Sequence, residues 1–327
     1  VRQLHNLFFS EDKSAHNLGV SWNNRFGNPS PPTTETPWWA QRRDTLLAIA
    51  QTQSPVYAYN LPTIHQVIEN LSCLTSLDGL FYAIKANHQP DVLEVIYDHG
   101  LGFECVSPGE ITHVLTTFPK IDPKRILFTP NFAPAVEYRF AIEKGVHVTI
   151  DNLHPIEHWP DIFRNQSIFV RVDPGQGRGH HSFVKTAGVQ SKFGLWPSQI
   201  DDLHTRLSAL NTTVIGLHAH SGSGIRAPHN WLEIAQFLSG VAERFPDVTV
   251  LNLGGGLGVI EKPDQTPLDL LAVNTSLDAF KADNPAFKLW MEPGRYLVAN
   301  AGVLLTTVTQ RKTKGQTTYV GVDTGMN

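Results

Sequence analysis

The chain has 327 residues, 41% of them hydrophobic, so it can bury the core of one large domain or of two smaller ones. A net charge of −4 gives no basic surface of the kind that binds nucleic acid. No apolar run approaches the roughly 20 residues of a membrane span, and two cysteines, Cys73 and Cys105, are too few for a disulfide framework or a zinc site. We therefore expect a cytoplasmic protein that has no metal centre and contacts neither nucleic acid nor membrane.

The N-terminal region differs from the rest of the chain. Residues 1–9 have the apolar spacing of a helix, and residues 27–37 are a Pro-rich segment typical of a linker. The chain begins with valine rather than methionine, which favours a piece of a longer protein. We interpret residues 1–53 as an N-terminal extension and linker.

From Pro55 onward, short apolar runs alternate with segments of helical period. The runs predicted to be strands are residues 81–84, 102–106, 126–129, 146–150, 168–172, 214–220, 248–253 and 289–292. The clearest predicted helices between them are residues 90–99, 108–118, 133–144, 197–210 and 230–245. This alternation indicates parallel βαβ units, and it predicts a (β/α)₈ TIM barrel over residues 54–300. A doubly wound open sheet is the alternative, and in both folds ligands gather at the carboxyl ends of the strands.

The pattern changes after the eighth predicted strand. Residues 303–310 and 317–322 alternate in polarity around a polar turn at 312–316, which predicts an antiparallel hairpin. Residues 55–60 contain a further short strand that could pair with it. We expect a small antiparallel β domain to begin at residue 301 and to be incomplete at Asn327, because two or three strands form only a marginal sheet.

A lysine follows the first predicted barrel strand. Lys85 ends the apolar run 81–84, and lysine is almost never fully buried unless it is paired. It therefore either reaches solvent at the rim or takes part in chemistry. A lysine amine can hold the aldehyde of pyridoxal phosphate covalently, so Lys85 is a candidate catalytic residue.

Three consecutive glycines follow the seventh predicted strand. Gly254, Gly255 and Gly256 would let backbone N–H groups approach a phosphate without obstruction by side chains. The segment fits neither the nucleotide P-loop nor the dinucleotide fingerprint. A glycine-rich turn can equally be structural, but phosphate sites of barrels commonly follow the seventh and eighth strands.

Two histidines end the sixth predicted strand. Alternation places His218 and His220 on one face, where His220 could stack on a cofactor ring while Ser223 donates to its phosphate. A polar strand end and a two-histidine metal site are the alternatives. A metal site needs a third ligand, and no other group obviously supplies one.

The eighth predicted strand leads into a tight turn. Pro293 and Gly294 shape this turn, which projects Glu292 and Arg295 from one corner. The two side chains could form a local ion pair. Alternatively, Arg295 binds an anion and Glu292 faces a pyridine nitrogen, where a carboxylate stabilises the protonated ring. A protonated ring is the stronger electron sink.

Five motifs in this order carry a family resemblance. They are FYAIKAN, FECVSPGE, GLHAHSGSG, LNLGGGLG and MEPGR. They resemble the fold-type III pyridoxal-phosphate decarboxylases, whose barrel is of the alanine-racemase-like type, and most of all the bacterial diaminopimelate decarboxylases. The segments RVDPG, SKFG and VDTGMN extend the resemblance over residues 54–327.

The resemblance implies a role for each matching residue. Lys85 would hold the cofactor, His220 would stack on its ring, and Glu292 would face its nitrogen. Arg295 would bind phosphate and is also a candidate for the substrate carboxylate. The other implied cofactor-site residues are Glu104, Glu110, Arg171, Ser223, Gly254, Gly255, Gly256, Pro293 and Gly294. A loop containing His181, Lys185 and Thr186 is expected to cover the site.

The resemblance also implies an activity and a partner. The activity is the pyridoxal-phosphate-dependent decarboxylation of meso-2,6-diaminopimelate to L-lysine by a homodimer whose active sites lie at the interface. The family's cysteine-bearing segment and phosphate-binding tyrosine are not in this sequence, which puts turnover by the chain alone in doubt. Residues 1–9 resemble the last helix of an aspartate kinase, which favours a fusion. The alternatives are an ornithine, lysine or arginine decarboxylase, an amino-acid racemase, and a regulatory protein that binds the cofactor without turnover.

Overall fold

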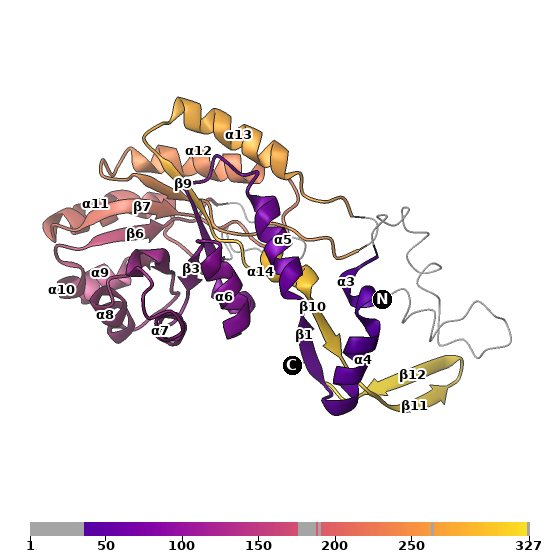
Figure 1. Cartoon of the computed structure of the whole chain (residues 1–327). Coiled ribbons are helices and arrows are strands. Elements are labelled where there is room, and N and C mark those ends of the chain that lie inside the picture. The colour runs from indigo at the N-terminus through magenta and orange to yellow at the C-terminus, as the bar shows by residue number, and fades with distance from the viewer. Residues whose placement is uncertain (1–35, 176–187, 189–190, 263–264, 326–327) are drawn as a thin grey trace. The chain divides into compact units, whose positions relative to one another are not determined.

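The computed structural model describes residues 36–175, 188, 191–262 and 265–325 (Figure 1). The chain divides into two compact units, a larger one of residues 64–259 and 267–300 and a smaller one that includes residues 301–325. The expected helix at residues 1–9 lies outside the described residues. Our division of the chain at residues 53 and 300 stays a prediction.

The larger unit contains a closed barrel of parallel strands in chain order. They are β2 (Gly79–Ala83), β3 (Gly102–Cys105), β4 (Ile126–Phe128), β5 (His147–Ile150), β6 (Ser167–Arg171), β7 (Thr213–His218), β8 (Val250–Asn252) and β9 (Lys288–Met291). β9 pairs with β2, Trp290 opposite Gly79 and Met291 opposite Leu80, and this closes the ring. The predicted barrel is therefore confirmed, and the open sheet is wrong.

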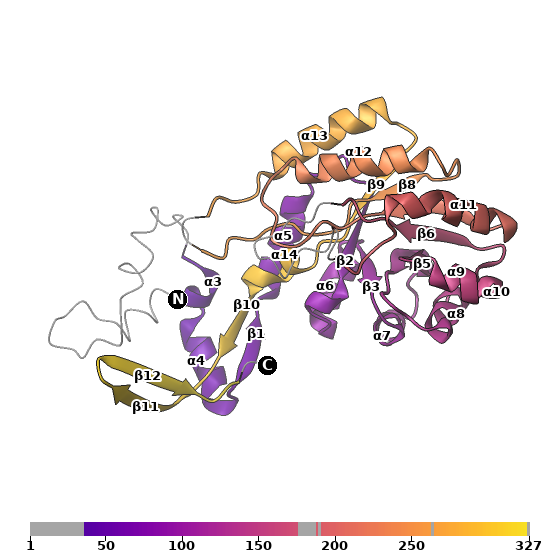
Figure 2. The same ribbon diagram turned by 180° about the vertical axis from the view of Figure 1, so that it is seen from behind.

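Helices lie around the outside of the barrel, and most of them connect one barrel strand to the next (Figure 2). They are α5 (Leu61–Leu71), α6 (Pro90–Asp98), α7 (Pro108–Thr117), α8 (Ala135–Glu143), α9 (His154–His158), α10 (Pro160–Phe163), α11 (Ile200–Ala209), α12 (Asn230–Ala242), α13 (Leu270–Asp283) and α14 (Arg295–Val298). Helices α12 and α13 lie side by side in both views. Among the residues that the structure describes, none of the helices is long and apolar enough to cross a membrane.

An apolar layer fills the interior of the barrel. Phe81, Leu127, Phe169 and Val250 form it, one from each of β2, β4, β6 and β8. This is the layering expected of the fold, in which alternate strands contribute the members of one layer. A Cβ at Gly216 would overlap the Phe169 ring, so the neighbouring strand must leave room for that ring. The packed layer leaves the carboxyl ends of the strands for polar groups.

The described residues of the smaller unit include antiparallel strand pairs and two short helices. β1 (Val56–Tyr59) pairs with β10 (Gly302–Leu305), and β11 (Val308–Lys314) pairs with β12 (Thr317–Val322). The helices are α3 (Trp38–Gln41) and α4 (Arg43–Thr52).

The predicted strand 303–310 is wrong as a single element, because the chain changes partner strand at Thr307. The Asp323 carboxylate accepts the Thr307 N–H at 2.9 Å and the Ser54 hydroxyl at 2.7 Å, which anchors this break. The predicted turn 312–316 is also too long. Lys314 still pairs with Thr317, and Gly315 takes the positive φ of 62° that the turn requires.

Candidate active site

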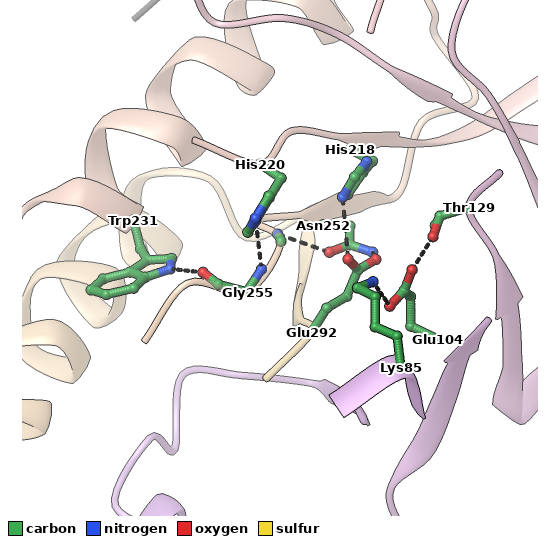
Figure 3. Close-up of polar contacts among 10 residues, drawn as sticks. Lys85, Glu104, Thr129, His218, His220, Trp231, Asn252, Gly255 and Glu292 are labelled. Carbon is green, nitrogen blue, oxygen red and sulfur yellow. Dashed lines mark hydrogen bonds and ion pairs between the residues drawn. The ribbon is translucent and has the colours of Figure 1, made fainter. Parts of the chain in front are cut away.

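Lys85 lies where β2 leaves the barrel. It belongs to a short 3₁₀ turn, Ile84–Ala86, directly after the strand. Its Nζ donates to Glu104 Oε2 on β3 at 2.5 Å, and the other Glu104 oxygen accepts the hydroxyl of Thr129, which follows β4 (Figure 3). Three successive strands therefore join Lys85, Glu104 and Thr129 in one chain of contacts at the barrel mouth.

Neighbouring carboxylates stabilise the charged form of Lys85. Burial disfavours the ammonium, but the Glu104 carboxylate, with Glu292 and Glu110 farther away, outweighs burial and raises the pKa of Lys85. The Lys85 side chain remains 54% exposed, whereas that of Glu104 is 2% exposed. The amine is thus ion-paired and still accessible from the mouth. Glu104 is the nearest group that can take its proton when the amine acts as a nucleophile.

Glu292 is a buried carboxylate that two neighbouring strands hold in place. Its Oε1 accepts from Asn252 Nδ2, at the end of β8, at 2.7 Å. Its Oε2 lies 3.3 Å from Nε2 of His218, at the end of β7. Burial opposes the charge of Glu292, but the attraction of His218, aided by Lys85 and His220, lowers the pKa of this carboxyl. Glu292 is therefore an anion at neutral pH, and its orientation is fixed.

His220 is a neutral ring beside the glycine turn. Burial, together with the charges of Arg171 and His218, lowers the pKa of His220 to about 3. Its Nδ1 accepts the Gly255 N–H at 3.2 Å, so the ring proton resides on Nε2. His220 thus uses the lone pair of Nδ1 for the Gly255 N–H, whereas His218 lies beside the Glu292 carboxylate.

The glycine turn is required by the close packing of three strand ends. Gly254 and Gly256 have φ of +66° and +90°, values that side chains other than glycine rarely adopt. A Cβ at Gly255 would overlap the carbonyl oxygen of Glu292, and one at Gly256 would overlap the carbonyl oxygen of Gly222. The structural interpretation of the triplet therefore holds. In addition, the Gly256 N–H has no acceptor within the described part of the chain, which leaves it available to an anion.

Arg171 and Glu110 lie at the same mouth but have different surroundings. Arg171 ends β6, is buried, and stacks its guanidinium 4.4 Å from the centroid of the Phe193 ring. Burial lowers the pKa of Arg171, although the nearby carboxylates oppose this. Glu110 lies in the first turn of α7. Its Oε2 accepts the Val106 N–H at 2.6 Å, and its own N–H donates to Ser107 Oγ at 3.3 Å. The Glu110 carboxylate therefore stabilises the N-terminus of α7 through its hydrogen bond to the Val106 N–H.

The remaining predicted residues follow β7 and β9. Ser223 is half-buried in the turn after β7, and Arg295 is the exposed first residue of α14. The Pro293 carbonyl accepts the Ala83 N–H at 3.2 Å, and a Cβ at Gly294 would lie 2.9 Å from the Ala83 Cβ. The turn after β9 thus packs directly against the end of β2, near Lys85. His181, Lys185 and Thr186 lie outside the described residues.

Sequence reasoning missed several residues that support the site. Asn252, Thr129 and Trp231 contact Glu292, Glu104 and Gly255, respectively. Asn252 offered a signal, because it is a polar residue inside an otherwise apolar strand, and buried polar groups almost always have a partner. Trp231 offered none, since a tryptophan on the apolar face of a helix is usually explained by packing alone.

Comparisons with known proteins identify the family. The family model described as "Pyridoxal-dependent decarboxylase, pyridoxal binding domain" matches residues 64–299. The chain belongs to this family. Its pyridoxal-binding domain is the barrel, and pyridoxal phosphate is therefore the cofactor.

The curated relatives of this family member include several diaminopimelate decarboxylases. That of Methanothermobacter thermautotrophicus is 33% identical over 261 residues, which cover 76% of this chain and 60% of the relative. That of Pseudomonas fluorescens is 30% identical, covering 84% of this chain and 68% of the relative. The crystal structure of the Helicobacter pylori diaminopimelate decarboxylase complexed with L-lysine shares the fold, with a TM-score of 0.77 at 23% identity, covering 86% of this chain and 73% of that one. The chain thus spans 60% of the first of these relatives.

The residues at the mouth fit the cofactor of this decarboxylase family. The strand ends at the barrel mouth carry an accessible amine (Lys85), a fixed buried carboxylate (Glu292) and a neutral ring (His220). The backbone N–H of Gly256 is left open in a turn where any Cβ would collide with neighbouring backbone. Such a set offers a nucleophile for an aldehyde, an anion for a ring nitrogen, a flat face for a ring and a donor for a phosphate, which are the chemical groups of pyridoxal phosphate.

Proposed function

We propose that this chain provides the cofactor-binding part of a diaminopimelate decarboxylase, which converts meso-2,6-diaminopimelate to L-lysine and CO₂. The observation that carries the proposal is that one barrel mouth holds both an accessible Lys85 amine, which is paired with Glu104, and a buried, anionic Glu292, which is held by His218. The names of the relatives support the substrate. We also propose that the protein acts as a cytoplasmic homodimer, in accordance with the family resemblance of its motifs.

The chemistry divides between the cofactor and the chain. When bound, pyridoxal phosphate supplies an electron sink for the electron pair left on the substrate α-carbon when CO₂ departs. Lys85 would hold the cofactor through its amine, and Glu104 is positioned to receive and return the amine proton. A proton delivered to the α-carbon takes the place of the lost carboxylate, which balances the reaction.

The other residues bind and orient the cofactor in this proposal. Glu292 keeps the ring nitrogen protonated, since a fixed anion stabilises the charged form. His220 offers an uncharged flat ring, and Arg171 neutralises part of the acidic mouth. Ser223, the Gly254–Gly256 turn and Arg295 bind the phosphate. An anion at Glu292 counts against a racemase, for which we expect a positively charged partner at that nitrogen.

Two measurements test this proposal. With pyridoxal phosphate added, the wild-type protein should show the visible absorbance of lysine-bound cofactor, and Lys85→Ala should lose it. Lys281→Ala is the matched control, because Lys281 also pairs with a carboxylate, Asp78, at 2.8 Å and should retain the absorbance. If Lys85→Ala keeps the wild-type spectrum, the assignment of Lys85 is wrong.

The second measurement is CO₂ release from meso-diaminopimelate, ornithine, lysine and arginine by the complete protein. We expect release from diaminopimelate only. Release from ornithine alone would refute the proposed substrate while leaving the cofactor assignment intact.

A further inference from the structure

We propose that Trp231 is a positioning residue for the cofactor phosphate. It holds the Gly255–Gly256 peptide so that the Gly256 N–H faces the cofactor rather than the outer helices. This inference rests on the proposed binding of pyridoxal phosphate at the glycine turn. It adds a residue outside the five motifs to the phosphate site.

The first observation is the hydrogen bond that Trp231 makes. Its indole Nε1 donates to the Gly255 carbonyl oxygen at 3.1 Å, and the side chain is completely buried. Figure 3 shows the indole on one side of Gly255 and His220 on the other. An indole N–H can only donate, and buried tryptophans usually find an acceptor for it.

The second observation is the geometry of the peptide itself. A trans peptide is planar, so the Gly256 N–H points opposite to the Gly255 carbonyl. Because that carbonyl points to Trp231, the Gly256 N–H points away from the indole. It has no acceptor among the described residues, as an anion-binding N–H requires.

The third observation concerns freedom of rotation. Glycines have no Cβ to restrict the backbone, so a peptide plane between two of them rotates more easily than any other. A hydrogen bond from a buried ring removes this freedom before the phosphate arrives, and preorganisation of this kind improves affinity. Without the indole N–H, the Gly255 carbonyl could turn toward the phosphate, where it would repel the anion.

The fourth observation is that the indole is itself anchored. Trp231 is the second residue of α12, and the first, Asn230, accepts the Ser221 hydroxyl through Oδ1 at 3.0 Å. Ser221 and Asn230 are both buried. The start of α12 is therefore tied to the turn after β7 through Asn230 and to the turn after β8 through Trp231. These are the two turns that present Ser223 and the glycines.

The test compares two ligands that differ only in the phosphate. Trp231→Phe removes the N–H and keeps an aromatic ring in the core. We expect it to weaken binding of pyridoxal phosphate about tenfold, the equivalent of one hydrogen bond, and to leave binding of pyridoxal unchanged. Binding is measured by titrating the cofactor-free protein and following the visible absorbance. Tyr138→Phe is the control, since it removes a buried hydroxyl that has no hydrogen-bond partner in the described part of the chain, and both affinities should stay at the wild-type values.

The outcomes are distinguishable. Equal weakening for both ligands, or no weakening for either, would overturn the role of Trp231. If the wild-type protein bound neither ligand, the proposed function itself would fail. If Trp231→Phe does not fold, Ser221→Ala is the second variant, because it removes the hydrogen bond that ties Asn230, at the start of α12, to the turn after β7. It should also lower the ratio of pyridoxal-phosphate to pyridoxal affinity, and an unchanged ratio would refute the proposal.

Discussion

Replacing Asn252 by leucine should destabilise the barrel, although the two side chains have the same branched shape and the same number of heavy atoms. Asn252 is completely buried at the end of β8. Its Nδ2 donates to Glu292 Oε1 at 2.7 Å, and its Oδ1 accepts the Gly254 N–H at 3.0 Å. Leucine would leave a buried carboxylate without one of its two partners and a buried N–H without any.

The expected magnitude follows from these two bonds. A hydrogen bond to a charged group contributes about 1.5–3 kcal/mol, and a buried donor left unsatisfied costs about 1–3 kcal/mol. We therefore expect Asn252→Leu to lower the free energy of unfolding by about 3–5 kcal/mol at neutral pH. The loss of unfolding free energy caused by Asn252→Leu should become smaller at acidic pH. The folded-state pKa of Glu292 is lowered from 4.5 to about 2, so its stabilising charge is present above pH 4.5 and is lost as the pH falls toward 2.

Urea denaturation followed by tryptophan fluorescence measures this difference. Asn70→Leu is the control, because Asn70 also forms a side-chain hydrogen bond, with Gln66, but at the surface of α5. It should change the stability by less than about 0.5 kcal/mol. A loss below about 1 kcal/mol for Asn252→Leu at neutral pH would show that Glu292 does not depend on this bond. A loss that stays constant below pH 4.5 would refute the role of the Glu292 charge.

Two further predictions concern the glycine turn and the base of the barrel. Gly255→Ala should cost about 1–3 kcal/mol of stability and weaken cofactor binding, because its Cβ would overlap the Glu292 carbonyl. Gly240→Ala is the control: Gly240 faces open space on α12, so this change should instead raise the stability by about 0.5–1 kcal/mol. Equal effects of the two substitutions in urea denaturation would contradict this prediction. Burial lowers the pKa of His147 from 6.5 to about 4, so the unfolded chain takes up this proton first and stability falls as the pH drops through that range. His147→Leu should remove roughly 3 kcal/mol of that acid-dependent loss, and an unchanged pH profile of stability would show the histidine to be uninvolved.

The barrel was predictable because its strands are buried on both faces. Such strands appear in the sequence as short continuous apolar runs, and all eight lie close to their predicted bounds. The hairpin was harder, because its strands are mostly exposed and have no buried face to define them. Nothing in the alternation of residues 303–310 reveals that Asp323 binds Thr307 and divides them between two partner strands.

The candidate site was likewise predictable only in part. The positions of Lys85, the glycine triplet and Glu292 at strand ends follow from the sequence alone, since parallel strands deliver their carboxyl ends to one mouth. The glycine triplet also indicates a tight turn by its residue type, because residues other than glycine rarely adopt the positive φ angles that the turn contains.

Only the tertiary structure decided which groups meet. The closure of the ring and the register of neighbouring strands bring Lys85 to Glu104 and place Asn252 and His218 on either oxygen of Glu292. Contacts of this kind join residues far apart in the chain, and a periodic pattern contains no information about the atoms that face each other across strands. The sequence by itself therefore determined the barrel and the place of its site, whereas packing determined which neighbours stabilise the charged forms of Lys85 and Glu292.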